Sequence, residues 1–538
     1  MKQFLLLLSA SLITASASAN EIRQVMLTRS DVQSNILQHR SCAAALSSES
    51  GAIIATPAGQ LTDNMTLSEF AVYPRGFEIY QRMVSGKVSA IVEGEDGCLY
   101  VKNPIGTYDT DSWLKLEHRE GNVYVAKLPQ PATESWDYEG ETIWMNFDRL
   151  EFDEDEGYYY PSFTESELSF SYENGTLTSI GEIGEDKEMP VMLGLTYNLY
   201  GPEDADEAWA WFGVNNITVK AMDAVPGALP EGLTGEKKLM ASSVGDSHVW
   251  VAVNGEDIYL RPGADFGYIS GKIADGKAVF ESNQYLGVSG NSHCYFLGGE
   301  SEFIEDDDYY EGGYTTYYPA DDLSFDYLTD GSLLKSDGAL IINEGNLSFY
   351  AKNIYDKPVI SDYKSVDAAP ENPVIVRYEP YDDFDEYGVF IFDLPNKSTT
   401  GETISKVDMY YNIFADGSDE PYVFTPAMYE LIGSPMTNIP YGFTDGGYDF
   451  SVNGTRHTVV LYEEIEVVGV QSVNVAGENE YKSQIVWSDG ALSGIESVTV
   501  TPAGESEFYD LTGRRVNQPS TGIYIRRQGN ITDKVVIK

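Results

Sequence analysis

The sequence has little cysteine, little histidine and few basic residues. Of its 538 residues, three are cysteine and five are histidine, and 34 lysines and arginines stand against 85 aspartates and glutamates. The formal net charge of −51 repels phosphate backbones and anionic membrane surfaces, which argues against nucleic-acid and membrane partners. Three cysteines (Cys42, Cys98 and Cys294) are too few for a disulfide framework. A Cys42–Cys98 bond and free buried thiols both stay open.

Long apolar runs and the motifs of common enzymes are also missing. Beyond the N-terminus no apolar run reaches the length of about 20 residues that a transmembrane segment needs. HExxH, Walker A and a GxGxxG followed by a helix are absent from the sequence, and so are the CxxC and CxH spacings of thiolate metal sites. We therefore predict no catalytic residues.

One block, Gly245-Asp246-Ser247-His248, resembles the nucleophile block of GDS-type lipases. Such a serine is inert without a base, and none of the five histidines has an aspartate three residues before it. A turn before a strand is the favoured interpretation of the block. A divergent secreted hydrolase is the least favoured of the functions that we consider.

The N-terminus has the pattern of a secretory signal peptide over residues 1–19. Lys2 supplies a positive charge, 4–8 form a short apolar core, and Ala17-Ser18-Ala19 gives a small-x-small cleavage site. We expect an exported protein at the outer cell surface or outside the cell, with the periplasm as the alternative.

The rest of the chain has the texture of antiparallel β structure. Short runs rich in valine, isoleucine, tyrosine, phenylalanine and threonine alternate with turn residues, including Asn-Gly at 174–175, 254–255 and 453–454. Long segments with a period of 3.6 residues are absent. The expected fold class is all-β, with modular antiparallel domains.

An internal repeat organises the first two thirds of the chain. Val92-Glu-Gly-Glu-Asp96 matches Val253-Asn-Gly-Glu-Asp257, and Leu168-Ser-Phe170 matches Leu323-Ser-Phe325. Matched blocks keep their order while their offset drifts only from about 161 to 155 residues, which indicates two copies of one β domain. The predicted organisation is a signal peptide (1–19), an N-terminal segment leading into the first domain (20–83), copy one (84–225), copy two (236–366), a sandwich-like module (371–487) and a C-terminal segment (493–538).

Two segments resemble known families. The module at 371–487, with Met409–Gly417 as a central strand and turn, resembles fibronectin type III and immunoglobulin-like sandwiches. The C-terminal segment carries Asp510-Leu-Thr-Gly513, Gly522-Ile-Tyr524 and a basic-ended strand at 534–538. This pattern resembles the C-terminal sorting domain of the type IX secretion system of Bacteroidota. That resemblance implies a small β-sandwich read by the export machinery, outer-membrane translocation and surface attachment.

Acidic runs precede tyrosines at matching places in the two copies. Hard oxygen ligands crowded on a loop are the ligands that calcium prefers, although neither run has the spacing of an EF-hand. The candidate calcium ligands are Asp153, Asp155, Asp306 and Asp308. The alternative is a solvated acidic loop without any cofactor.

Aromatic side chains are the better indication of function. Trp209 and Trp211 would lie on one face of a strand, and tyrosines stand beside the acidic runs. Aromatic rings next to carboxylates suit glycan binding, while ordinary strand packing explains the same residues without a ligand. The candidate ligand-binding residues are Trp209, Trp211, Tyr158, Tyr159, Tyr160, Tyr309 and Tyr310. We expect a non-catalytic secreted or surface protein that binds a glycan or an extracellular protein; the alternative is a structural spacer.

Overall fold

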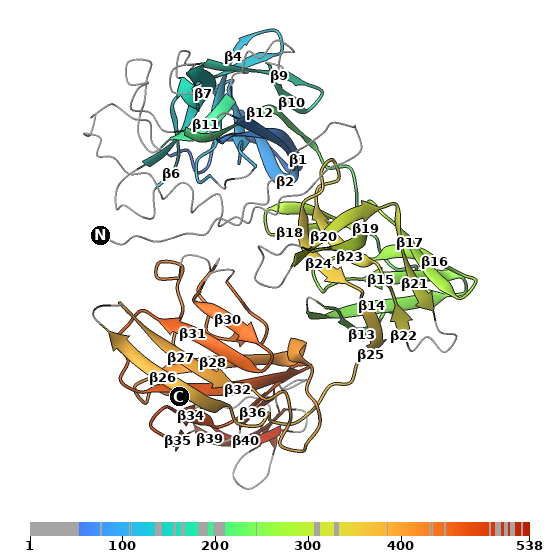
Figure 1. Cartoon of the computed structure of the whole chain (residues 1–538), viewed down its shortest axis with the longest axis vertical. Coiled ribbons are helices and arrows are strands. Elements are labelled where there is room, and N and C mark those ends of the chain that lie inside the picture. The colour runs from blue at the N-terminus through green and yellow to red at the C-terminus, as the bar shows by residue number, and fades with distance from the viewer. Residues whose placement is uncertain are drawn as a thin grey trace. The chain divides into compact units, whose positions relative to one another are not determined.

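The computed structural model is built from antiparallel β-strands, which confirms the predicted fold class (Figure 1). It describes the backbone of 53–537 apart from 76–77, 107, 109, 135–141, 154–157, 163–166, 181–191, 197–209, 244, 306–312, 328–332, 383, 385, 430–431, 433, 446–447, 494–496, 501–506, 510–514, 517–521 and 529–530. The chain divides into two compact units, Met1–Asp362 and Tyr363–Lys538. The one helical element among the described residues is a 3-10 turn, η2 (Lys406–Asp408).

Unit one begins with a segment of strands that closes on itself. Pairing runs in a ring through β1, β2, β3, β4, β5, β9, β10 and β12 and back to β1. We call this ring the first barrel. Its segment contains β1 (Gly59–Arg75), β2 (Glu78–Gly94), β3 (Leu99–Lys102), β4 (Leu114–Glu120), β5 (Val123–Lys127), β6 (Gln130–Glu134), β7 (Thr142–Asp153), β8 (Tyr158–Ser162), β9 (Glu167–Glu173), β10 (Thr176–Ser179), β11 (Met192–Thr196) and β12 (Ala210–Ala221).

The following segment repeats the same scheme. A second closed barrel is formed by β13, β14, β15, β16, β17, β21, β22 and β25. Each copy also has a second row of paired strands, β6-β7-β11 in the first and β18-β19-β23 in the second, and in the first copy β11 also pairs with β12 of the ring. The strands are β13 (Glu236–Ala241), β14 (Asp246–Asn254), β15 (Asp257–Arg261), β16 (Ile269–Ala274), β17 (Lys277–Glu281), β18 (Gln284–Ser289), β19 (Ser292–Glu305), β20 (Gly313–Ala320), β21 (Asp322–Tyr327), β22 (Leu333–Lys335), β23 (Ala339–Glu344), β24 (Ala351–Asp356) and β25 (Val359–Asp362).

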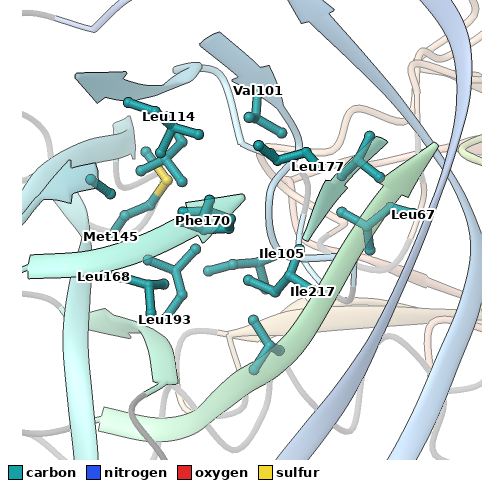
Figure 2. Packing of buried hydrophobic residues seen from close by; sticks show 14 of the residues in the cluster. Leu67, Val101, Ile105, Leu114, Met145, Leu168, Phe170, Leu177, Leu193 and Ile217 are labelled. Atoms are coloured by element: carbon teal, nitrogen blue, oxygen red, sulfur yellow. The ribbon is translucent and has the colours of Figure 1, made fainter. Parts of the chain in front are cut away.

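The cores of the two barrels are filled differently. Aliphatic side chains such as Leu67, Leu114 and Ile217 surround Phe170 in the first barrel (Figure 2). In the second barrel Phe280 contacts Phe296 and Phe325, with ring centroids 6.4 and 5.9 Å apart in edge-to-face geometry. Buried and more exposed residues alternate along strands such as β15 and β27, which places one apolar face on the core, whereas β11 and β23 are buried along their whole length.

A glutamine side chain makes the same hydrogen bonds in both copies. In the first, Gln130 accepts from the Lys115 N–H (2.8 Å) and donates to the Lys115 and Lys127 carbonyls (2.9 and 3.0 Å). In the second, Gln284 accepts from the Ser270 N–H (2.7 Å) and donates to the carbonyls of Ser270 and Glu281 (2.9 and 2.8 Å). We call this arrangement the glutamine clasp. It ties the first residue of the second row to two strands of the barrel.

The two copies meet through the turn between β18 and β19. The Val88 N–H of β2 donates to the Asn291 carbonyl at 3.0 Å, so the sheet continues from one copy into the other. Beside this bond, Lys87 forms an ion pair with Glu344 of β23, and both side chains are largely buried. The His293 ring lies between the Met65 carbonyl (3.1 Å) and the Tyr285 hydroxyl (2.8 Å). The junction is therefore polar and hydrogen-bonded rather than a loose linker.

Unit two is a sandwich of two sheets. One sheet has the order β26-β27-β31-β30, and the other contains β29-β28-β32-β33-β36. The strands are β26 (Val374–Asp382), β27 (Tyr387–Asp393), β28 (Met409–Ala415), β29 (Ile439–Pro440), β30 (Phe450–Asn453), β31 (Arg456–Leu461), β32 (Val468–Ala476), β33 (Asn479–Lys482), β34 (Ile485–Trp487), β35 (Leu492–Ser493) and β36 (Ser497–Val500).

The C-terminal segment adds a separate small sheet. Its order is β38-β37-β39-β40, with β37 (Glu507–Tyr509), β38 (Arg515–Val516), β39 (Gly522–Gln528) and β40 (Ile531–Ile537). β36 lies within the predicted segment 493–538 but pairs with β33 of the sandwich. No described helix is long and apolar enough to cross a membrane.

The described cysteines carry free thiols. Cys98 is partly exposed and Cys294 is buried, and burial raises the pKa of the Cys294 thiol to about 11. Cys42 lies outside the described residues.

Candidate functional site

The predicted binding residues that the structure describes lie on β7, β8 and β12. Tyr158, Tyr159 and Tyr160 form most of β8, Asp153 ends β7, and Trp211 lies in β12. The structure gives the backbone of these residues and not their side chains. Trp209, Asp155, Asp306, Asp308, Tyr309 and Tyr310 lie outside the described residues.

β7 and β8 form a two-stranded extension, as do β19 and β20 in the second copy. Pairing of β7 with β11 ends at Asp148, and 149–153 then pair with 158–162 alone among the described strands. Pairing of β19 with β23 ends at Gly299, and 300–305 pair with 313–318. We call these extensions ribbon one and ribbon two. Of the predicted residues that the structure describes, Asp153 and Tyr158–Tyr160 therefore lie on ribbon one, and ribbon two is its equivalent in the second copy.

Side chains are described on ribbon two, where an aromatic ring reaches solvent. Phe303 is 57 % exposed and is paired with Thr315. On the same face Tyr317 packs against the buried cluster of Leu297 and Ile341, and burial raises the pKa of its hydroxyl. An anchored tyrosine at the base and an exposed phenylalanine toward the tip give this face an apolar strip.

The other face of ribbon two is acidic and aromatic. Glu300 and Glu302 are exposed there, opposite Tyr318 and Thr316. The ribbon sequences 300–305 and 313–320 contain no lysine, arginine or histidine. Carboxylates accept hydrogen bonds from hydroxyls, and tyrosine offers both an apolar ring and a polar end. The ribbon thus combines an apolar strip with hydrogen-bond acceptors.

The outer strand of each ribbon contains a proline. Pro161 lies in β8 and Pro319 lies in β20. Proline has no N–H to donate, and it is tolerated in sheets chiefly at edges. Pro161 therefore removes one backbone donor within ribbon one, and Pro319 removes one directly after ribbon two, where it is paired with Gly299, which disfavours the addition of a further strand there.

A calcium site finds no support in the described part of the chain. Among these residues no group of three or more histidine, cysteine, aspartate or glutamate side chains converges in a way that could hold a metal ion. The proposed ligands Asp155, Asp306 and Asp308 fall outside the described residues, so the calcium prediction is untested at its own position.

The lipase-like block is a strand in the second barrel. Ser247 and His248 are consecutive residues of β14, paired with Met240 and Leu239. Consecutive side chains of a strand point to opposite faces, so the two side chains are not arranged as a nucleophile and its base.

Of the tryptophans outside the predicted binding set, Trp144 and Trp487 are buried. Trp113 and Trp250 are half-buried, and Trp136 lies outside the described residues. The Arg261 guanidinium covers Trp250, 5.1 Å from its ring. A favourable cation–π contact thus occupies the ring face that a ligand would need.

The sequence reasoning missed Phe303. Its signal was present as an apolar pair, Phe303 and Ile304, inside an otherwise acidic run. Two apolar residues within an acidic run are compatible with a buried strand or with an exposed ribbon. Only the pairing of β19 in the structure distinguishes these two possibilities. Comparisons with family models, curated proteins and solved structures gave no match.

Proposed function

We propose that this chain is a secreted or surface-attached, non-catalytic protein that binds a glycan through its two ribbons. The observation that carries the proposal is the exposed Phe303 ring of ribbon two, with the exposed Glu305 carboxylate two residues further along the same face. The equivalent position of ribbon one, with Tyr158–Tyr160 in its outer strand, supports a site that is present twice.

A glycan suits this chemistry better than an extended peptide. Aromatic rings stack on the apolar faces of sugars, while carboxylates accept hydrogen bonds from sugar hydroxyls. An extended peptide would add to the outer strand through its backbone, and Pro161 and Pro319 interrupt the donors of those strands. Binding of an extracellular protein through side chains is the second candidate.

A glycan array probed with the full chain tests the proposal. We expect selective binding, weakened roughly tenfold or about 1.4 kcal/mol in Phe303→Ala. Val253→Ala is the matched control, because Val253 is an exposed apolar residue of the same barrel outside the ribbon. Binding that is unchanged in Phe303→Ala would remove the ribbon from the site. No binding to any glycan would favour the spacer, which the two closed barrels also suit.

We also propose export through the type IX machinery. The support is the secretory pattern at 1–19 and the motif strands β37, β39 and β40 in the C-terminal segment. Deleting 507–538 leaves β36 paired with the sandwich and should retain the protein in the periplasm of a type IX-competent bacterium. Unchanged release, measured by cell fractionation, would contradict this assignment.

A further inference from the structure

One end of the unit-two sandwich presents aromatic rings to solvent. Phe384 is 89 % exposed and Tyr448 is 90 % exposed, while Tyr387 and Tyr462 are 40 % and 37 % exposed. We call these four residues the aromatic end. Fully exposed large rings are uncommon on soluble domains unless they contact something.

The sheet register brings the four residues to the same end. Gly388 is paired with Leu461, so Tyr387 at the start of β27 and Tyr462 directly after β31 occupy neighbouring positions. Phe450 is paired with Val459, which puts Tyr448 just before β30 at that end. Phe384 lies in the turn between β26 and β27. Adjoining strands are roughly 5 Å apart, so the four residues lie on neighbouring strands and turns at one end of this sheet.

Hydrogen bonds hold this end in place. The Tyr462 hydroxyl donates to the Asp449 carboxylate at 2.7 Å, joining the two segments that carry Tyr462 and Tyr448. The Phe384 N–H donates to the Asp382 side chain at 2.8 Å. Beneath them Tyr429 is buried and its ring lies 5.4 Å from that of Tyr462. The Tyr462 ring therefore packs against the aromatic core of the sandwich.

The charge of the surrounding chain has one sign. Residues 378–396, 407–455 and 458–481 contain no lysine, arginine or histidine. Exposed carboxylates of Asp382, Glu386, Glu463 and Glu464 accompany the rings. Exposed rings beside exposed carboxylates suit a cation, because a lysine or arginine head group gains both cation–π attraction and ionic attraction.

We propose that the aromatic end binds a basic polypeptide segment of a partner protein, rich in arginine. This surface belongs to unit two and the ribbons belong to unit one, so the proposal does not depend on glycan binding. Arginine is favoured over lysine because its planar guanidinium stacks on aromatic rings and pairs with carboxylates through two donors.

The test measures binding of a labelled peptide of alternating arginine and serine to the full chain by fluorescence anisotropy. The double variant Phe384→Ala/Tyr448→Ala keeps the net charge, and its thermal midpoint should not move because both rings are exposed. Two exposed cation–π contacts predict a Kd raised roughly five- to thirty-fold. Val374→Ala is the matched control, since Val374 is exposed at the other end of β26.

The outcomes separate this site from general attraction to an acidic protein. Weaker binding in the double variant, unchanged binding in Val374→Ala and weaker binding of the lysine–serine peptide would support the proposal. Equal affinity of the wild-type chain and the double variant would overturn it, because net charge alone would then explain binding. Absence of binding at low salt would also overturn it, whatever the glycan array shows.

Discussion

The two barrels of unit one share their strand pairing but differ in what fills them. Both keep the glutamine clasp, made by Gln130 in the first and Gln284 in the second. At the centre of the cores, Ala126 and Phe280 occupy the same place, since each is paired with the leucine of a matched Leu-Ser-Phe block. The two barrels thus keep the same polar contacts at the strand ends together with the same strand pairing. Their core volumes, in contrast, are filled by different side chains.

This difference shows which features of a β domain are interchangeable. Apolar side chains can be exchanged as long as the total volume and the pattern of the faces are kept. A buried or half-buried hydrogen-bonding side chain can be replaced only by one that makes the same hydrogen bonds, because a buried polar group without a partner lowers the stability of the fold. The glutamine clasp belongs to the second kind, and the alanine and phenylalanine belong to the first.

The largest expected effect is in the core that depends on aromatic rings. Phe280→Ala leaves a cavity beside Phe296 and Phe325 and should destabilise the second barrel by about 3–5 kcal/mol. Hydrogen exchange of the full chain would show this as lost protection over 236–362, with 59–221 as the internal reference. A loss below about 1 kcal/mol would mean that the aliphatic neighbours close the space as they do around Ala126.

A smaller loss of stability, of equal size in the two barrels, is expected when the glutamine clasp is removed. Gln130→Met and Gln284→Met keep the side-chain length and remove the hydrogen bonds to two strands, which should cost about 1–2 kcal/mol each. Protection from exchange in β4 and β16 is the measurement, with each barrel as the control for the other. Loss in one barrel alone would show that the clasp does not have the same role in both copies.

The smallest expected effect is on the pH dependence of stability at the junction of the two copies, to which each copy contributes different residues. Burial lowers the pKa of His293, so the unfolded chain takes up a proton at higher pH than the folded chain does. The contribution of neutral, buried His293 to the free energy of unfolding is therefore present above the ordinary histidine pKa of about 6.5. It declines as the pH falls below that value, by at most about 1.4 kcal/mol per pH unit. Urea titrations at pH 7.5 and 5.5 should show a smaller decline in His293→Gln. An equal decline would assign the pH dependence to other groups.

Sequence reasoning anticipated the all-β class because the turn residues and alternation are local signals. It placed the start of copy one at 84, whereas the first barrel contains β1 from Gly59. The two copies differ most there, since β1 has 17 residues and β13 has 6, so the repeat gave no match. Phe303 and the aromatic end were beyond reach for a different reason. Exposure depends on which strands lack a neighbour, and neither periodicity nor composition contains that information.

The prolines of the outer strands have a consequence for how copies of the protein behave when they are crowded. A sheet edge with a full row of donors and acceptors templates the addition of strands from other molecules, which is the first step toward fibrils. Pro161 and Pro319 remove a donor from such rows in β8 and β20. At high concentration, molecules can therefore contact one another through the aromatic side chains of the ribbons without pairing their strands into a shared sheet.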